Sequence, residues 1–163
     1  MAVNNPQWNH PMITINTADL HACESLRLIE NLSSELATIT GDSGTRHFAV
    51  DSMKGERAVW VIARNATGDA VGCAALRPLT EQVAELKRMY SDRSEPGIGQ
   101  ALLAFLEASA QRLGYGEIWL ETRKVNRRAV NFYERNGYRA IDNYGPYIGR
   151  QEAICFAKKI MMT

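Results

Sequence analysis

The sequence predicts an α/β (α+β) domain in which a mixed β-sheet is flanked by helices. Segments with strand-like alternation of apolar and polar residues are interleaved with segments whose apolar residues recur at helical spacing. The length of 163 residues is typical of one domain. Because no internal repeat or low-complexity linker divides the sequence, we expect residues 1–163 to form a single domain.

The first part of the chain is expected to contain a strand, a helix and three further strands. Leu20, Cys23 and Leu26 recur at helical spacing, and the turn-rich segment 41–46 ends this pattern. The segment 65–69 has the composition of a hairpin connection. The expected elements are a strand at 12–16, a helix at 19–39, and strands at 59–63, 70–76 and 83–90.

The second part is expected to contain two helices and three strands. Leu102, Leu106 and Leu113 mark the apolar stripe of a helix that starts after Gly97 and stops at Gly114. The remaining expected elements are a strand at 117–122, a helix at 126–136, and strands at 138–141 and 153–158. The whole order is therefore strand, helix, three strands, helix, strand, helix and two strands.

Composition and charge exclude several classes of protein. Apolar residues make up 45% and charged residues 23% of the chain, as in folded globular proteins and unlike disordered or collagen-like chains. Nineteen basic and eighteen acidic residues leave a net charge of +1. No overall field would attract nucleic acid or an anionic membrane, and no apolar stretch approaches the roughly 20 residues that span a bilayer. We expect neither kind of partner.

The three cysteines indicate a reducing compartment. Cys23, Cys73 and Cys155 are odd in number and far apart, with no CxxC pair and no histidine at metal-ligand spacing. The first residues also lack the basic and apolar regions of a secretory signal. We therefore expect a cytoplasmic protein without a metal site.

A glycine pair precedes the helix of the second part. Gly97 and Gly99 lie where the unpaired N–H groups of a helix start are exposed, and anions bind well there. A dinucleotide fingerprint would need a third glycine where Leu102 stands, and a Walker A loop would need a Gly-Lys-Ser/Thr sequence, which is missing. Taken alone, the pair is also compatible with a plain tight turn.

Motifs around these glycines resemble those of the GNAT N-acetyltransferase superfamily. They are, in order, AELKRMY at 84–90, GIGQALL at 97–103, WLET at 119–122 and NRRAVNFYERNGY at 126–138. The resemblance covers about residues 57–160. It implies a mostly antiparallel sheet of about six or seven strands, splayed between the strands at 83–91 and 117–122, with acetyl-CoA as the acyl donor.

The resemblance also implies where the cofactor binds. The pantetheine arm would enter the splay, and the pyrophosphate would meet the backbone amides at the start of the helix. The implied cofactor residues are Met89, Tyr90 and Ser91 on the strand, Gly97, Ile98, Gly99, Gln100 and Ala101 at the helix start, and Asn126, Ala129 and Arg135 on the last helix.

One segment departs from the family pattern. Ser94 stands where the family has Arg or Gln, with Arg93 beside it, and Glu95-Pro96 replaces a small and basic pair. The segment from Tyr90 to Gly97 is also shorter than usual by about two residues. This departure bears on the affinity for the cofactor rather than on its identity.

Two side chains take catalytic roles by resemblance. Glu85 would deprotonate the amine, and Tyr133 would protonate the departing CoA thiolate, with a backbone N–H near Met89 as oxyanion donor. For Glu85, a solvent-exposed ion pair with Lys87 or Arg88 is an equally weighted alternative. For Tyr133, the alternative is simple packing on the sheet.

Helical spacing adds support for Tyr133. Asn126, Ala129 and Tyr133 stand at i, i+3 and i+7, so they share one face of their helix. The same spacing points Phe132 and Arg135 elsewhere, although the resemblance gives Arg135 to a CoA phosphate.

Candidates on the acceptor side are Arg77, His47, Tyr144 and Tyr147. Arg77 could bind an acceptor carboxylate or be an ordinary exposed arginine, and the other three belong to loops expected at the mouth of the cleft. For His47, which stands alone, a structural or surface role is the alternative. The function implied is transfer of an acetyl group from acetyl-CoA to a primary amine, of a small molecule, by direct attack in a ternary complex. The alternative is a non-catalytic acyl-CoA-binding or protein-interaction module, which the altered loop at Ser94 supports. A homodimer is one option, because dimers are common in the family.

Overall fold

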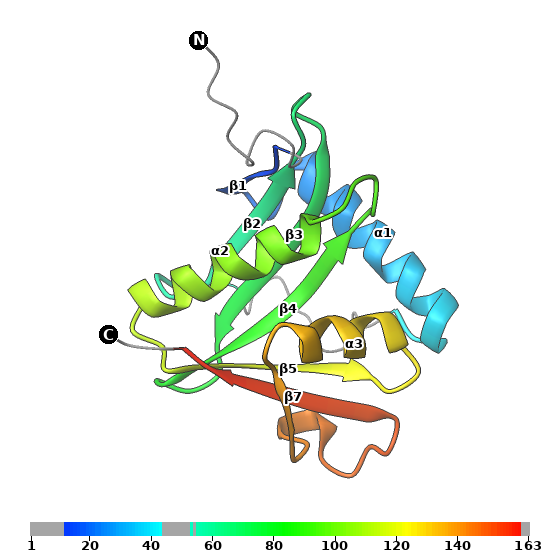
Figure 1. The fold of residues 1–163 in the computed structure, drawn as a ribbon, viewed down its shortest axis with the longest axis vertical. Coiled ribbons are helices and arrows are strands. Elements are labelled where there is room, and N and C mark those ends of the chain that lie inside the picture. Colours follow the sequence, from blue (N-terminus) through cyan, green and yellow to red (C-terminus); the bar gives the residue numbers. More distant parts are fainter. Residues whose placement is uncertain (1–11, 44–52, 54, 161–163) are drawn as a thin grey trace.

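A computed structural model of the chain describes residues 12–43, 53 and 55–160. Within them, seven strands form one sheet in the order β1-β2-β3-β4-β5-β7-β6 (Figure 1). The strands are β1 (Thr14–Thr17), β2 (Val59–Arg64), β3 (Ala70–Pro78), β4 (Val83–Ser91), β5 (Glu117–Arg123), β6 (Arg139–Ile141) and β7 (Ala153–Lys159). The helices are α1 (Cys23–Thr40), α2 (Ile98–Arg112) and α3 (Arg127–Arg135), with a 3-10 turn η4 (Gly145–Tyr147). The predicted fold class and order of elements are confirmed.

Two differences from the expected elements have local causes. The first helix starts at Cys23 rather than at residue 19, because Asp19 closes a turn in which its Oδ1 accepts a hydrogen bond from the His21 N–H at 2.8 Å. The loop between β6 and β7 contains η4, whose proline at the start of the turn fixes the backbone for it.

Neighbouring strands are antiparallel except for β4 and β5, which are parallel. Only three residue pairs join these two strands, from Val83 with Glu117 to Glu85 with Trp119. Beyond the third pair the strands diverge, β4 toward the start of α2 and β5 toward α3 (Figure 1). The splay predicted between the strands at 83–91 and 117–122 is therefore present.

A β-bulge lies on β4 where it leaves β5. Lys87 pairs with Ala75 and Tyr90 with Cys73, so two residues of β4 face one residue of β3. One of the two is Arg88, whose φ of +54° is in the left-handed region. Its buried guanidinium donates to the Ile29 carbonyl oxygen of α1 at 2.9 Å. The bulge thereby ties β4 to α1.

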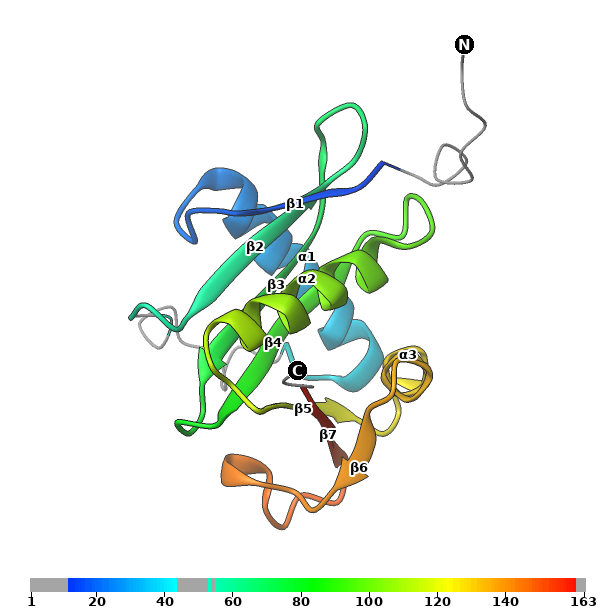
Figure 2. The ribbon, with the colours of Figure 1, turned by 60° about the vertical axis from the view of Figure 1, so that its left-hand side comes forward.

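The two faces of the sheet carry different elements. Residues alternate along β2, so that Val61 packs in the core beneath α2, whereas Trp60 and Ile62 pack with α1. Figure 2 shows α1 and α2 on opposite sides of β2, β3 and β4. Helix α3 joins the α2 side, where Val130 and Tyr133 belong to the same core. On the α1 side, the loop between β6 and β7 packs its own aromatic cluster against β5 and β7.

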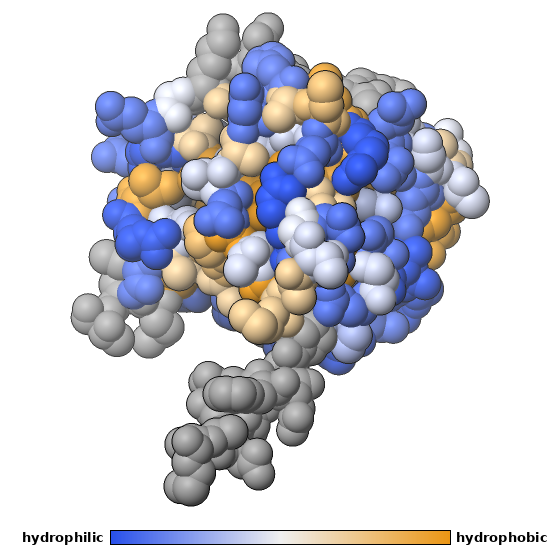
Figure 3. All heavy atoms as spheres, turned by 90° about the horizontal axis from the view of Figure 1, so that it is seen from above, coloured by the Kyte–Doolittle hydropathy of each residue, from blue (hydrophilic) through white to orange (hydrophobic). Residues whose placement is uncertain are grey.

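Most of the surface at the end of the molecule seen in Figure 3 is hydrophilic, with smaller hydrophobic patches between. Among the described helices, none combines the length and the apolar character that a membrane crossing requires.

Candidate active site

A cavity of about 680 Å³ occupies the gap between β4 and β5. It is lined from both faces of the sheet, by the start of α2 and by α3 on one side and by α1 and Tyr147 on the other. A molecule bound in this cavity can therefore contact side chains from both faces of the sheet. We describe the α2 side first and the α1 side afterwards.

The start of α2 offers unpaired backbone donors to the cavity. The first bond along the helix runs from the Ala101 N–H to the Gly97 carbonyl oxygen at 2.9 Å. In the described part of the chain, the N–H groups of Ile98, Gly99 and Gln100 have no hydrogen-bond partner, and all three residues line the cavity. Gly97 has a φ of +89°, a conformation that favours glycine. These donors fit an anion such as a diphosphate.

The geometry corrects one expectation about this helix start, at Ala101, and shows what surrounds Gly99. Ala101 lies outside the cavity lining and its N–H is already bonded, so it has no donor left for a phosphate. At Gly99, an added Cβ would lie 3.4 Å from the Phe132 ring of α3. The absence of a side chain at Gly99 therefore allows the close approach of α2 and α3, while its N–H remains one of the three unpaired donors at the cavity.

The segment before Gly97, whose sequence departs from the family pattern, forms a turn and contacts α1. Asp92 Oδ1 accepts from the Ser94 N–H at 2.9 Å and from its hydroxyl at 2.6 Å, forming a compact turn. Arg93 reaches across to Glu35 of α1, with 2.8 Å between Nη2 and Oε1. Ser94 and Arg93 both line the cavity, although the guanidinium is engaged by Glu35.

Helix α3 supplies the other wall of the α2 side. Asn126 caps the helix by accepting from the Ala129 N–H at 3.3 Å, which fixes its position at the cavity. The lining residues of this wall are Asn126, Arg128, Ala129, Phe132, Tyr133 and Arg135. The expectation that Phe132 and Arg135 point elsewhere is wrong, because a short helix beside a wide cavity presents more than one stripe to it. Arg128 and Arg135 add positive charge to this half.

Tyr133 combines both of its predicted environments. It is buried, with an exposure of 6%, and packs against the rings of Phe132, Tyr138 and Phe156. It also lines the cavity. Burial raises the pKa of its hydroxyl well above the usual value, so the group keeps its proton at neutral pH. The hydroxyl is therefore a donor.

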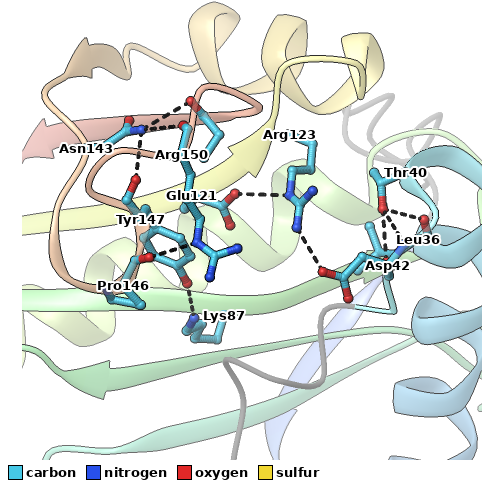
Figure 4. A network of polar contacts seen from close by, with 11 residues as sticks. Leu36, Thr40, Asp42, Lys87, Glu121, Arg123, Asn143, Pro146, Tyr147 and Arg150 are labelled. Carbon is cyan, nitrogen blue, oxygen red and sulfur yellow. Dashed lines mark hydrogen bonds and ion pairs between the residues drawn. The ribbon is translucent and has the colours of Figure 1, made fainter.

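The α1 side of the cavity carries a polar network (Figure 4). Lys87 Nζ on β4 donates to the Tyr147 hydroxyl at 2.6 Å. On β5, Arg123 forms an ion pair with Asp42, which follows α1, at 2.9 Å, and lies 3.7 Å from the Glu121 carboxylate. All five residues line the cavity. Burial raises the pKa of Glu121, against the opposing effect of the nearby cations.

Glu85 is not one of the lining residues. Its carboxylate is 3% exposed, and it accepts from Arg77 Nε at 2.9 Å and from the Tyr144 hydroxyl at 2.7 Å. Lys87 Nζ lies 3.7 Å away. The expected pairing with Lys87 is present, but it is buried rather than exposed to solvent. The Glu85 carboxylate therefore lies behind the residues that line the cavity, where it pairs with Arg77 and Lys87.

Most of the other predicted residues lie at the cavity. Met89, Tyr90, Ser91, Gly97 and Tyr147 line it, whereas Arg77 and Tyr144 are engaged with Glu85 behind its wall. His47 lies outside the described residues.

Sequence reasoning missed Glu121, Lys87 and Arg123 as site residues. For the two residues on β5, the sequence does contain a signal. Side chains alternate along a strand, so Trp119, Glu121 and Arg123 lie on the face opposite Ile118 and Leu120.

This geometry agrees with a comparison of the chain with known families. The acetyltransferase (GNAT) family profile matches residues 26–138, more than half of the chain. The chain belongs to this family.

Individual relatives agree with that assignment. A ribosomal protein bS18-alanine N-acetyltransferase of Escherichia coli is 36% identical over 75 residues, which are 44% of this chain and 51% of that protein. The match thus spans about half the length of this curated relative. The crystal structure of the same E. coli enzyme has a TM-score of 0.66 at 25% identity, covering 93% of this chain and 96% of the other.

Two further solved structures share the fold. A protein described as an acyl-CoA N-acyltransferase from Klebsiella pneumoniae has a TM-score of 0.80 at 27% identity, over 92% of this chain and 99% of the other. An N-acetyltransferase from Thermoplasma acidophilum, solved in complex with coenzyme A, has a TM-score of 0.67 at 19% identity, over 91% and 99% of the two chains. The T. acidophilum protein thus binds coenzyme A on this fold.

Proposed function

We propose that this GNAT protein transfers an acetyl group from acetyl-CoA to a primary amine of a small molecule, by direct attack in a ternary complex. The observation that carries the proposal is the cavity in the splay, with unpaired backbone amides on one face of the sheet and the Glu121 carboxylate on the other. The two substrates would enter from opposite faces and meet between β4 and β5.

The α2 side fits acetyl-CoA. The amides of Ile98, Gly99 and Gln100 would hold the diphosphate, and the dipole of α2 favours negative charge there. Arg128 and Arg135 would add cations at the phosphates. Bound in this way, acetyl-CoA supplies an activated thioester, so that the protein needs only to orient it and to manage protons.

The α1 side fits the amine. An alkylammonium with a pKa of roughly 10.4 must lose a proton before it can attack. Three carboxylates line this side, but Asp42 is paired with Arg123 at 2.9 Å and Glu35 with Arg93 at 2.8 Å. The raised pKa of Glu121 makes it a better proton acceptor than an ordinary glutamate. We assign this role to Glu121 rather than to Glu85, because both oxygens of Glu85 are occupied behind the wall.

Tyr133 completes the proposal from the opposite face. Its protonated hydroxyl, at the α3 wall, would donate to the sulfur as CoA departs. The proton acceptor and the proton donor thus stand on opposite sides of the sheet, which matches the direction of proton movement from amine to thiolate.

The small-molecule acceptor rests on the near-neutral charge of the chain. The cytoplasmic location and a homodimer belong to the same proposal. The test is release of the CoA thiol from acetyl-CoA across a panel of primary amines and of peptides with a free N-terminus, with the acetylated product identified by mass. We expect amine-dependent release with small amines. Binding of CoA without release for any acceptor would favour the non-catalytic module, and release with peptides alone would favour a protein acceptor.

A further inference from the structure

Lys87 places a positive charge on the acceptor side of the cavity. Among the described lysines it alone lines the cavity, and its side chain is 12% exposed. The Tyr147 hydroxyl accepts its hydrogen bond at 2.6 Å and fixes the direction of the ammonium group. A cation this well ordered and this poorly solvated costs free energy unless an anion approaches it.

The protein's own anions only partly balance this cation. Glu85 is 3.7 Å from Lys87 Nζ, but its Oε1 also accepts from Arg77 at 2.9 Å, so one carboxylate faces two cations. Asp42 is paired with Arg123. Glu121 lines the same cavity as Lys87 and adds further negative charge on this side.

That balance changes during the reaction of the proposed function. When Glu121 accepts the proton of the ammonium group, it loses its negative charge. Lys87 then keeps only Glu85, at 3.7 Å, which it shares with Arg77. A carboxylate carried by the acceptor itself would restore the balance, and would be held next to the reacting nitrogen.

We propose that Lys87 binds a carboxylate of the acceptor, and that the acceptors are free α-amino acids. The proposal rests on the function proposed above. The ammonium group faces Glu121 while the carboxylate faces Lys87 and the Tyr147 hydroxyl. Leu36 and Ile39 of α1 line the same cavity and suit an apolar side chain. The ammonium group passes one proton to Glu121, the nitrogen forms a bond to the acetyl carbon, and the carbon–sulfur bond breaks. The thiolate takes the proton of Tyr133, the second proton lost by the nitrogen restores the Tyr133 hydroxyl, and Glu121 releases its proton to solvent.

Three acceptors with the same side-chain shape show how much the carboxylate of the acceptor contributes. Leucine has the carboxylate, leucinamide replaces it with a neutral amide, and isoamylamine lacks it. A site built to bind one polar group discriminates against analogues without it. We expect kcat/KM for leucine to exceed that for each of the other two by roughly tenfold to a hundredfold, the scale of a hydrogen bond to a charged group.

Variants of Lys87 connect the preference to this side chain. Lys87→Met should remove the preference by lowering kcat/KM for leucine alone, mainly through KM, and Lys87→Arg should retain part of it. Lys159→Met, which removes an exposed lysine outside the cavity, serves as the control and should keep the preference. A leucine:leucinamide ratio near one in the parent, or an equal loss for all three acceptors in a folded Lys87→Met variant, would overturn the proposal.

A direct measurement of leucine binding distinguishes failure of the Lys87 site from failure of the proposed acetyl transfer. Calorimetry of leucine against the CoA-saturated protein should give a Kd that weakens at least tenfold in Lys87→Met. If leucine binds in this way but no amine releases the thiol, the proposed activity is wrong while the amino acid site stands. If amines are acetylated but leucine does not bind more tightly than leucinamide, only the inference about Lys87 is wrong.

Discussion

The Tyr144 hydroxyl donates a hydrogen bond to Glu85 Oε2 at 2.7 Å, and both side chains are buried. The contact joins the loop between β6 and β7 to the strand that carries the bulge. With Arg77 on the other oxygen, it satisfies a carboxylate that has almost no access to water. This pair therefore supports the α1 side of the cavity without facing it.

Removal of that hydroxyl should destabilise the fold. Tyr144→Phe leaves the buried Glu85 carboxylate short of one donor, and we expect a loss of about 1.5–3 kcal/mol in the free energy of unfolding. The matched control is Tyr115→Phe, which removes a bond from a buried tyrosine to the neutral Arg57 carbonyl oxygen and should cost about 0.5–1.5 kcal/mol. Denaturant unfolding measures both. Equal losses would mean that the charge of Glu85 adds nothing to the contact.

The raised pKa of Glu121 predicts two effects of Glu121→Gln. Activity should fall by roughly 10² to 10⁴ at neutral pH and recover partly as the amine deprotonates in solution. The parent should lose activity as pH falls through the raised pKa, on an acid limb above the reference value of 4.5, and the variant should lack that limb. Profiles of kcat/KM against pH measure this.

The stability of the fold should increase in Glu121→Gln, although its activity falls. A carboxyl whose pKa is raised by folding contributes stability that is present below its unfolded pKa and is lost as pH rises through the folded value. Glu121→Gln should therefore raise Tm at neutral pH, and the difference should vanish near pH 4. Glu85→Gln should instead lower the stability by about 3 kcal/mol, because it leaves buried cations without their anion. If Glu85→Gln, and not Glu121→Gln, abolishes the acid limb in a folded protein, the role assigned by resemblance returns to Glu85.

Periodicity in the sequence was sufficient to predict the elements, because it is local. The alternation in β2 and the stripe of Leu102 and Leu106 report directly which side of each element is buried. The site needed more than local pattern. Glu35 and Leu36 reach the cavity only because α1 packs across β3 and β4, a contact between distant segments. The bulge at Arg88 also could not be foreseen, since no glycine marks it.

Gly97 provides a test of the anion site at α2. Gly97→Ala forces a side chain into φ of +89°, which costs about 1–2 kcal/mol and should disturb the amides that follow. We expect at least tenfold weaker binding of CoA by calorimetry. Gly114→Ala is the control, because Gly114 has a φ of +86° at the far end of α2 and no atom near its added Cβ. It should lose similar stability and keep its affinity for CoA. Equal affinities in both variants would remove the start of α2 from the cofactor site.

Gly99 should respond to the size of its substituent. The Cβ of Gly99→Ala would contact the Phe132 ring at 3.4 Å, so small changes in Tm and in CoA affinity are expected. Gly99→Val adds branches that must displace this ring, which lines the cavity, and it should weaken CoA binding sharply while the protein still folds. Unchanged affinity in a folded Gly99→Val variant would show that the ring position does not matter for the cofactor.

Tyr133→Phe tests the proton donor, and the aromatic cluster supplies its own control. The substitution removes one hydroxyl from a side chain that keeps its contacts with Phe132, Tyr138 and Phe156, so Tm should hardly change. Turnover should fall by roughly 10² to 10⁴ with the affinity for acetyl-CoA nearly kept, as for loss of a general acid. Tyr138→Phe removes a hydroxyl from the neighbouring ring, but that group donates to Glu107 at 2.9 Å and is not part of the cavity lining. It should lose some stability and retain turnover.

The pH profile gives a second test of Tyr133. Because burial raises the pKa of Tyr133, removal of its hydroxyl should lower the rate equally across the neutral range instead of shifting a limb of the pH profile. A folded Tyr133→Phe variant that binds acetyl-CoA and turns over within a few-fold of the parent would assign this tyrosine to packing alone.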